Sequence, residues 1–133
     1  MIKLRGYIFS RPFLEERVPQ HVQNIIIRDY CSKNNFHYLL SATEYAMPHS
    51  DVMLKHILEQ LDEIDGIIAY SIFQLPENFK SRYSIIKQII KKKKEFHFAC
   101  ENMSIQNDDD FEKIETIWQI KLTTMLNKPV GVV

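Results

Sequence analysis

The segment Asp65-Gly66-Ile67-Ile68-Ala69-Tyr70-Ser71-Ile72-Phe73 lies near the middle of the chain and decides our interpretation of the fold. Asp65-Gly66 is typical of a turn, and the apolar run Ile67–Phe73 predicts a short strand. Short apolar strands of this kind are typical of a parallel sheet that helices cover on both faces. The segments on either side should therefore alternate between helix and strand.

Three more strands and four helices are expected around this strand. The other short runs rich in β-branched and aromatic residues are Ile2–Phe9, Phe36–Ala42 and Phe96–Cys100. Apolar residues recur at helical spacing in Val18–Lys33, in Leu54–Ile64, in the stripe Phe79, Tyr83, Ile86, Ile89 and Ile90, and from Asn107–Asp110 to Met125. This order predicts a three-layer α/β sandwich with a mainly parallel sheet of four, possibly five, strands.

Composition restricts the class of protein further. With 133 residues we expect one domain, residues 1–133, in which residues 128–133 form a loose tail. Lys+Arg 17 balance Asp+Glu 17, so we expect no nucleic-acid partner held by phosphate neutralisation. No apolar run is long enough to span a membrane, and Cys31 and Cys100 have no metal or disulfide spacing, which favours a cytoplasmic protein.

Polar residues gather where the predicted strands end. In parallel α/β sheets, ligands bind beyond the carboxyl ends of the strands, near the point where strand order reverses. The residues at these ends that we expect to contact a ligand are Ser10, Arg11, Thr43, Glu44, Tyr45, Ser71, Gln74 and Glu101.

A second polar set lies on the first predicted helix. Gln20, His21, Asn24 and Arg28 recur every three or four residues and therefore share one stripe. The start of this helix, beside Arg11, could bind a phosphate or carboxylate group. The alternative is that the stripe is only the solvated face of the helix.

Ser10, His21 and Glu44 are candidates for catalysis, and Glu101 is the possible second carboxylate of an acid–base pair. Ser10 would be a nucleophile if a base lay within hydrogen-bond reach, and His21 is the nearest histidine in the sequence. Glu44 and Glu101 would serve as general acid and base if both entered one crevice. The alternatives are a hydrogen-bonding serine in a loop and solvent-exposed carboxylates.

The remaining histidines do not indicate a metal site. His97 and His37 lie within apolar strands, where a histidine with satisfied hydrogen bonds in the core or at the sheet edge is expected. His49 and His56 are poorly spaced to share an ion. We therefore predict no metal site, and no residue pattern demands a cofactor.

Four strings resemble a small bacterial family, the sporadic carbohydrate cluster proteins, found among surface-polysaccharide biosynthesis genes. The strings are Arg5-Gly6-Tyr7-Ile8-Phe9-Ser10-Arg11, Pro19-Gln20-His21-Val22-Gln23-Asn24, Leu40-Ser41-Ala42-Thr43-Glu44-Tyr45 and Tyr70-Ser71-Ile72-Phe73-Gln74-Leu75-Pro76. The resemblance implies carbohydrate biosynthesis, by an enzyme or binding protein for a sugar, nucleotide-sugar or related anionic metabolite. Arg11 and Arg28 would then hold the anion, while His21 and Glu44 would move protons.

A looser resemblance connects the chain with the catalytic domain of the serine recombinases, which exchange DNA strands. The Gly6-Tyr7 strand, Asp65-Gly66-Ile67-Ile68 and the long final helix are similar to that domain, and a flavodoxin-like fold is the other candidate. However, Arg11 stands where the family has its nucleophilic serine, five residues after the glycine. The segment Ser71–Pro76 also lacks the family's arginines, which stabilise phosphoryl transfer.

These departures imply an alternative function without catalysis. The chain would be an oligomeric regulatory or scaffold protein on a recombinase-like fold. Its last helix carries Trp118 and Met125 among its apolar residues and could form the contact of a homodimer.

Overall fold

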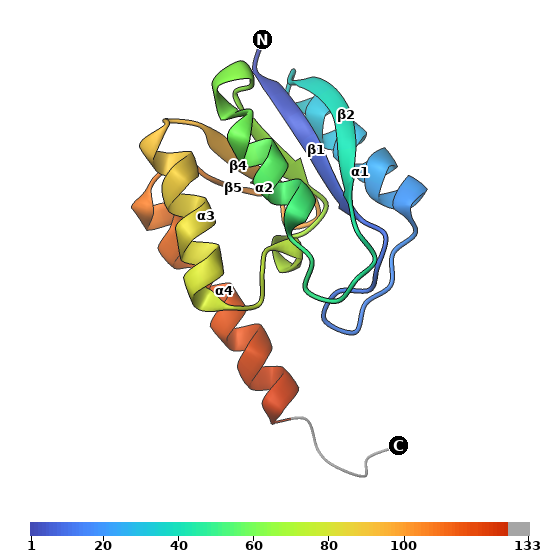
Figure 1. Cartoon of the computed structure of the whole chain (residues 1–133), viewed down its shortest axis with the longest axis vertical. Helices are drawn as coiled ribbons and strands as arrows, with labels where there is room; N and C mark the ends of the chain where they lie inside the picture. Colours follow the sequence, from blue (N-terminus) through green and yellow to red (C-terminus); the bar gives the residue numbers. More distant parts are fainter. Residues whose placement is uncertain (128–133) are drawn as a thin grey trace.

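A five-stranded sheet forms the centre of the protein, whose computed structural model describes residues 1–127 (Figure 1). The strands are β1 (Lys3–Phe9), β2 (His37–Glu44), β3 (Gly66–Ala69), β4 (Glu95–Phe98) and β5 (Met103–Ile105), in the spatial order β2-β1-β3-β4-β5. All neighbouring pairs are parallel except β4 and β5. The predicted α/β sandwich with a mainly parallel sheet is confirmed, and the number of strands is five.

Helices cover both faces of the sheet. They are α1 (Gln20–Lys33), α2 (Val52–Glu59), α3 (Phe79–Lys91) and α4 (Asp108–Leu126), with two short 3₁₀ turns, η1 (Leu61–Glu63) and η2 (Ile72–Gln74). On one face, Ile27 and Cys31 of α1 pack with Leu4, Ile8 and Ile68 of the sheet. The opposite face carries a larger core to which α2, α3 and α4 contribute. Among the described residues, no helix is both long and apolar enough to cross a membrane.

The strand order reverses between β1 and β3, which places the ligand-binding edge of the sheet. From β1 the chain passes through α1 to β2 on one side of β1, and then through α2 to β3 on the other side. In sheets of this topology the loops after the two central strands separate, and this leaves a crevice at their carboxyl ends. Residues 10–19 and 70–78 form these two loops.

The third strand is shorter than the sequence predicts, because side chains end it. β3 stops at Ala69, and Ser71 caps the turn η2, where its hydroxyl accepts a hydrogen bond from the Phe73 N–H at 3.2 Å. The Gln74 side-chain oxygen accepts from the N–H groups of Tyr70 at 2.9 Å and Ser71 at 3.2 Å. These bonds replace the strand ladder that the apolar run Ile67–Phe73 predicts.

Other differences arise at the ends and the surface of elements. The helix predicted to reach Ile64 ends at Glu59, and η1 completes the segment. Phe79 and Tyr83, predicted to face the core, are 48% and 45% exposed, and their rings pack against the outer side of the buried Phe111. The predicted tail 128–133 lies outside the described residues.

A buried arginine attaches α4 to the rest of the protein. Arg82 of α3 has no exposed side-chain surface, and its guanidinium binds both carboxylate oxygens of Glu115 on α4, at 3.0 and 2.5 Å. The same group donates to the carbonyl oxygens of Pro76 and Glu77 and lies 4.4 Å from the Trp118 ring centre. Trp118 in turn donates to the Ile72 carbonyl at 3.1 Å. Helix α4 is therefore fixed to both α3 and η2.

We predict that Arg82→Met destabilises the protein by about 3 kcal/mol, because it leaves the Glu115 carboxylate without its buried partner. The double variant Arg82→Met/Glu115→Leu should recover most of this loss, since no uncompensated charge remains. Urea unfolding of both variants, with the exposed Lys80→Met as control, measures the effect. Equal stability of the single and double variants would contradict this account.

Candidate functional site

The carboxylate of Glu44 is the central polar group at the carboxyl ends of β1 and β2. Its side chain is 1% exposed, and Tyr7 in β1 donates to it at 2.8 Å. Ser50 donates from the following loop at 2.9 Å. The remaining donors are the backbone N–H groups of Tyr45, Met53 and Leu54, at 3.0 to 3.3 Å. Glu44 therefore joins two strands to the start of α2.

This arrangement keeps Glu44 ionised. Burial alone would raise the pKa of its carboxyl group, because a charged form is poorly solvated in the interior. The hydrogen bonds from Tyr7, Met53, Tyr45 and Ser50 outweigh burial and hold the pKa below its ordinary value. A carboxylate in this state is a poor proton donor at neutral pH, so its contacts favour a structural role.

Ser10 and Arg11 extend the same connection from the end of β1. The Ser10 hydroxyl donates to the Glu44 carbonyl at 2.8 Å, and Arg11 donates to the Tyr45 carbonyl at 3.0 Å. The Arg11 guanidinium also lies 4.1 Å from the centre of the Phe9 ring. His21 is exposed on the first turn of α1, and within residues 1–127 no hydrogen bond joins it to Ser10. The structure thus does not assemble the predicted nucleophile and base.

Gln23, which the sequence analysis missed, links the two halves of the crevice. Its fully buried amide pairs with the backbone of Phe9, donating to the carbonyl at 2.9 Å and accepting from the N–H at 3.0 Å. It also accepts from the Gln74 amide at 2.8 Å. The available signal was position, since Gln23 lies four and eight residues before the buried Ile27 and Cys31 and so shares their face.

Ser71, Gln74 and Glu101 do come together, at the ends of β3 and β4. The Ser71 hydroxyl donates to one oxygen of Glu101 at 2.7 Å, and the Ile72 N–H donates to the other at 2.9 Å. Burial is the main reason that the pKa of Glu101 is raised, although these hydrogen bonds act against it. Glu44 and Glu101 therefore occupy separate clusters, each with its own donors.

The predicted polar stripe of α1 points elsewhere. Asn24 accepts hydrogen bonds from Ser41 and Tyr38 of β2, at 2.7 and 3.3 Å, and Arg28 stacks over the Tyr38 ring at 5.3 Å. Gln20, like His21, is exposed. Asn24 and Arg28 thus contact the outer strand and do not reach the crevice. Thr43 lies within β2, paired with Ile8.

His97 has the environment that its place in an apolar strand predicts. It is 3% exposed, and its two ring nitrogens lie 2.7 Å from the Tyr30 hydroxyl and the Glu95 carboxylate. Burial lowers its pKa. Across the described part of the chain, no three His, Cys, Asp or Glu side chains gather in a way that could hold a metal ion.

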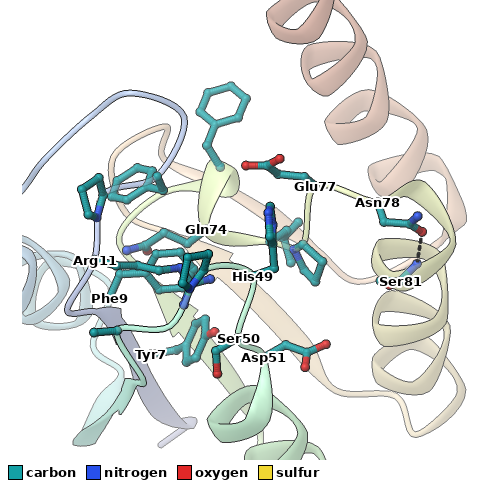
Figure 2. Close-up of a pocket in the computed structure, with 17 residues that line it drawn as sticks. Tyr7, Phe9, Arg11, His49, Ser50, Asp51, Gln74, Glu77, Asn78 and Ser81 are labelled. Atoms are coloured by element: carbon teal, nitrogen blue, oxygen red, sulfur yellow. Dashed lines mark hydrogen bonds between the residues drawn. The ribbon is translucent and has the colours of Figure 1, made fainter.

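A cavity of about 580 Å³ lies beside Tyr7 and Ser50, two of the residues that donate to Glu44. Figure 2 draws the residues that line it. Of the residues predicted to contact a ligand, Arg11 and Gln74 line it. The sequence analysis did not assign the other polar residues of its wall, which are His49, Ser50, Asp51, Glu77, Asn78 and Ser81. His49, Ser50 and Asp51 come from the loop before α2. Glu77 and Asn78 come from the loop before α3, and Ser81 lies in the first turn of α3, so segments far apart in sequence form the cavity.

Comparison with known proteins establishes the fold. No family model and no curated protein matches the chain. The N-terminal catalytic domain of TP901-1 integrase superposes with a TM-score of 0.64 and 11% identity, over 94% of this chain and 99% of that one. A resolvase family site-specific recombinase from Streptococcus pneumoniae has a TM-score of 0.64 and 7% identity, over 92% and 91%. The fold is that of a resolvase-type catalytic domain.

This finding corrects two expectations. The resemblance to the sporadic carbohydrate cluster proteins is not supported, because no family model matches. The prediction of a carbohydrate or nucleotide-sugar partner, with nucleic acid excluded, is wrong, since the proteins that share the fold are an integrase and a site-specific recombinase. A neutral net charge does not exclude a nucleic-acid partner, because it describes the whole chain and not the distribution of charge over its surface.

We predict that Glu44→Gln lowers the free energy of unfolding by about 2–4 kcal/mol, because an amide cannot accept from all the donors that the carboxylate satisfies. The matched control is Glu59→Gln, whose side chain is 76% exposed. Thermal and urea unfolding measure both variants. Similar stabilities for the two would show that the Glu44 contacts contribute little.

The pH dependence should have a definite sign. Because the pKa of Glu44 is lower in the folded than in the unfolded chain, the unfolded chain takes up the proton first as the pH falls. The contribution of ionised Glu44 to stability is complete at neutral pH. It is lost as the pH falls from the ordinary pKa of a glutamate, which applies to the unfolded chain, through the lowered pKa of the folded chain. The free energy of unfolding, measured by urea unfolding at several pH values across this range, should decrease less steeply with falling pH for Glu44→Gln than for the wild type.

Proposed function

We propose that the chain is a non-catalytic, oligomeric regulatory or scaffold protein on a recombinase fold, and that it pairs through α4. The observation that carries this proposal is the exposed C-terminal half of α4, which projects from the body of the protein in Figure 1. Ile120 is 62% exposed and Leu126 is 85% exposed. Apolar side chains this exposed on one projecting helix favour a partner that covers them.

The charge of this half-helix supports a second copy as the partner. Residues 116–126 contain a single charged residue, Lys121, whereas residues 108–115 contain six. A shallow groove runs along the helix and is lined by Thr116, Gln119, Ile120, Thr123 and Thr124, together with Glu112 and Glu115. Beyond the two glutamates at its start, the isoleucine and threonine side chains of this groove can face their copies across a two-fold axis without repulsion between like charges.

The polar groups at the strand ends support the absence of catalysis. Ser10 donates to a backbone carbonyl, and Glu44 is saturated by donors and held ionised. Arg11 stands at the position of the recombinase nucleophile, and the segment Ser71–Pro76 supplies none of the family's arginines. A nucleophile needs an adjacent base and a charge-stabilising partner, which these contacts do not provide.

The cellular setting is part of the proposal. Both cysteines are free, Cys31 in the core and Cys100 at the surface, which is compatible with the reducing cytoplasm. Because the fold is that of recombinases, the proposed oligomer is compatible with a role close to DNA. The proposal therefore predicts assembly without strand cleavage.

Ile120→Glu should convert the protein to a monomer, because two buried glutamates would face each other across the contact. Ile25→Glu is the matched control, since Ile25 is equally exposed, at 62%, but lies on α1. Sedimentation velocity at several protein concentrations measures the association. A wild-type protein that stays monomeric, or equal disruption by both variants, would contradict pairing through α4.

The absence of catalysis is tested on supercoiled plasmid DNA. We expect neither relaxation nor a covalent protein–DNA product, and we expect Ser10→Ala to behave as the wild type does. Gel electrophoresis after denaturation detects both products. A covalent product that disappears in Ser10→Ala would establish strand cleavage and exclude the proposed function.

A further inference from the structure

The cavity beside Tyr7 and Ser50 has the size and shape of a small-molecule site that the proposed function does not use. Its volume, about 580 Å³, lies within the range of roughly 300–1,000 Å³ that is common for ligand pockets. Its walls come from the end of β1, from the loops that follow β1 and β2, and from η2 with the segment that leads into α3. It therefore lies at the edge of the sheet where the strand order reverses. The position and the volume together indicate a ligand.

Much of the wall is apolar and held in place by the core. Phe13 and Leu75 are 5% and 3% exposed, and Phe73 packs edge-to-face on the buried Trp118, with ring centres 5.3 Å apart. Pro12, Pro48 and Pro76 stand in the three loops that form the rim. Rings and prolines with few rotatable bonds give a surface that loses little entropy when an apolar group binds.

Charges of opposite sign face this cavity from different loops. Figure 2 shows Arg11 beside Phe9, and the carboxylates of Asp51 and Glu77 on the side away from it. In the described chain, one N–H group of Arg11 donates to the Tyr45 carbonyl, which leaves other donors of its guanidinium for a ligand. The guanidinium is also kept in position by the Phe9 ring.

The two signs of charge act on the same point of the cavity floor. Burial is the main cause that raises the pKa of Tyr7 far above its ordinary value, followed by the neighbouring Glu44. Arg11 lowers this pKa and Asp51 raises it, so both charges lie within electrostatic reach of the Tyr7 hydroxyl. Arg11, Asp51 and Tyr7 all line the cavity.

We propose that this cavity binds a small zwitterion with an apolar body, of the amino-acid or short-peptide class. Its carboxylate would pair with Arg11, its ammonium group with Glu77 and Asp51, and its side chain would lie against Phe13 and Phe73. A simple anion would be repelled by the two carboxylates, and a simple cation by the guanidinium. Only a ligand that carries both charges satisfies both walls.

His49 adds a structural reason to regard the rim as specialised. It lines the cavity with φ of 62°, in the left-handed region that residues other than glycine rarely adopt. Strain of this kind persists where the surrounding contacts enforce it and is frequent at ligand sites.

The test is isothermal titration with four probes: L-phenylalanine, the dipeptide alanyl-phenylalanine, 3-phenylpropionate and phenethylamine. The first two carry both charges at different separations and distinguish a free amino acid from a peptide. The last two keep the ring but carry one charge only. We expect at least one zwitterion to bind about tenfold or more tightly than either singly charged analogue.

Charge-neutralising variants assign the contacts. Arg11→Gln, Glu77→Gln and Asp51→Asn should each weaken binding of the zwitterion about tenfold, whereas the exposed Arg17→Gln and Glu63→Gln should not. Thermal unfolding checks that each variant is folded. Asp51 makes no capping hydrogen bond to α2, and its ion pair with Lys55, at 3.4 Å, involves a lysine that is 67% exposed. Exposed pairs of this kind contribute little, so Asp51→Asn should leave the melting temperature nearly unchanged.

Three results would overturn the proposal. They are no binding of either zwitterion, equal binding of 3-phenylpropionate with no effect of Glu77→Gln and Asp51→Asn, or equal binding of phenethylamine with no effect of Arg11→Gln. The proposal does not depend on pairing through α4. Ile120→Glu should bind the zwitterion with unchanged affinity, so failure of one proposal is distinguishable from failure of the other.

Discussion

The buried charge of Glu44 is the constraint on which the crevice depends. An ionised carboxylate loses the solvation of water when it is buried, and hydrogen bonds from the protein have to replace it. The donors are the Tyr7 hydroxyl, the Ser50 hydroxyl and backbone N–H groups that include that of Met53, from three different segments. They meet only if β1, β2 and the start of α2 are correctly placed, so one side chain specifies the floor of the cavity.

The other buried polar groups are likewise paired with partners inside the protein. Gln74 donates a hydrogen bond to Gln23, and Arg82 forms an ion pair with Glu115 between α3 and α4. These polar groups therefore stabilise the fold and are not available to a ligand. Two surface features have no such role in holding the fold together: the charged rim of the cavity and the projecting C-terminal half of α4. Phe73 lies between them, because it lines the cavity and packs on Trp118 of α4.

Most of the architecture was predictable because it rests on local patterns. Alternating apolar runs and helical stripes identified four strands and four helices, and α4 begins within the predicted segment Asn107–Asp110, where the Asn107 side chain accepts from the Asp110 N–H. The strand that was not located, β5, is three residues long and pairs with β4 after a turn, so no periodicity marks it. Phe79 was assigned to the core because hydrophobicity alone does not reveal which apolar residues remain at the surface.

The candidate site shows where sequence reasoning ends. The sequence by itself determined which polar residues follow the strands, and Ser10, Glu44, Ser71 and Gln74 do lie at those ends. Only the tertiary structure decided their state, because a hydrogen-bond partner such as Gln23 comes from a segment far away along the chain. Spacing along a chain fixes which residues share an element, whereas burial, pKa and cavities depend on which elements meet.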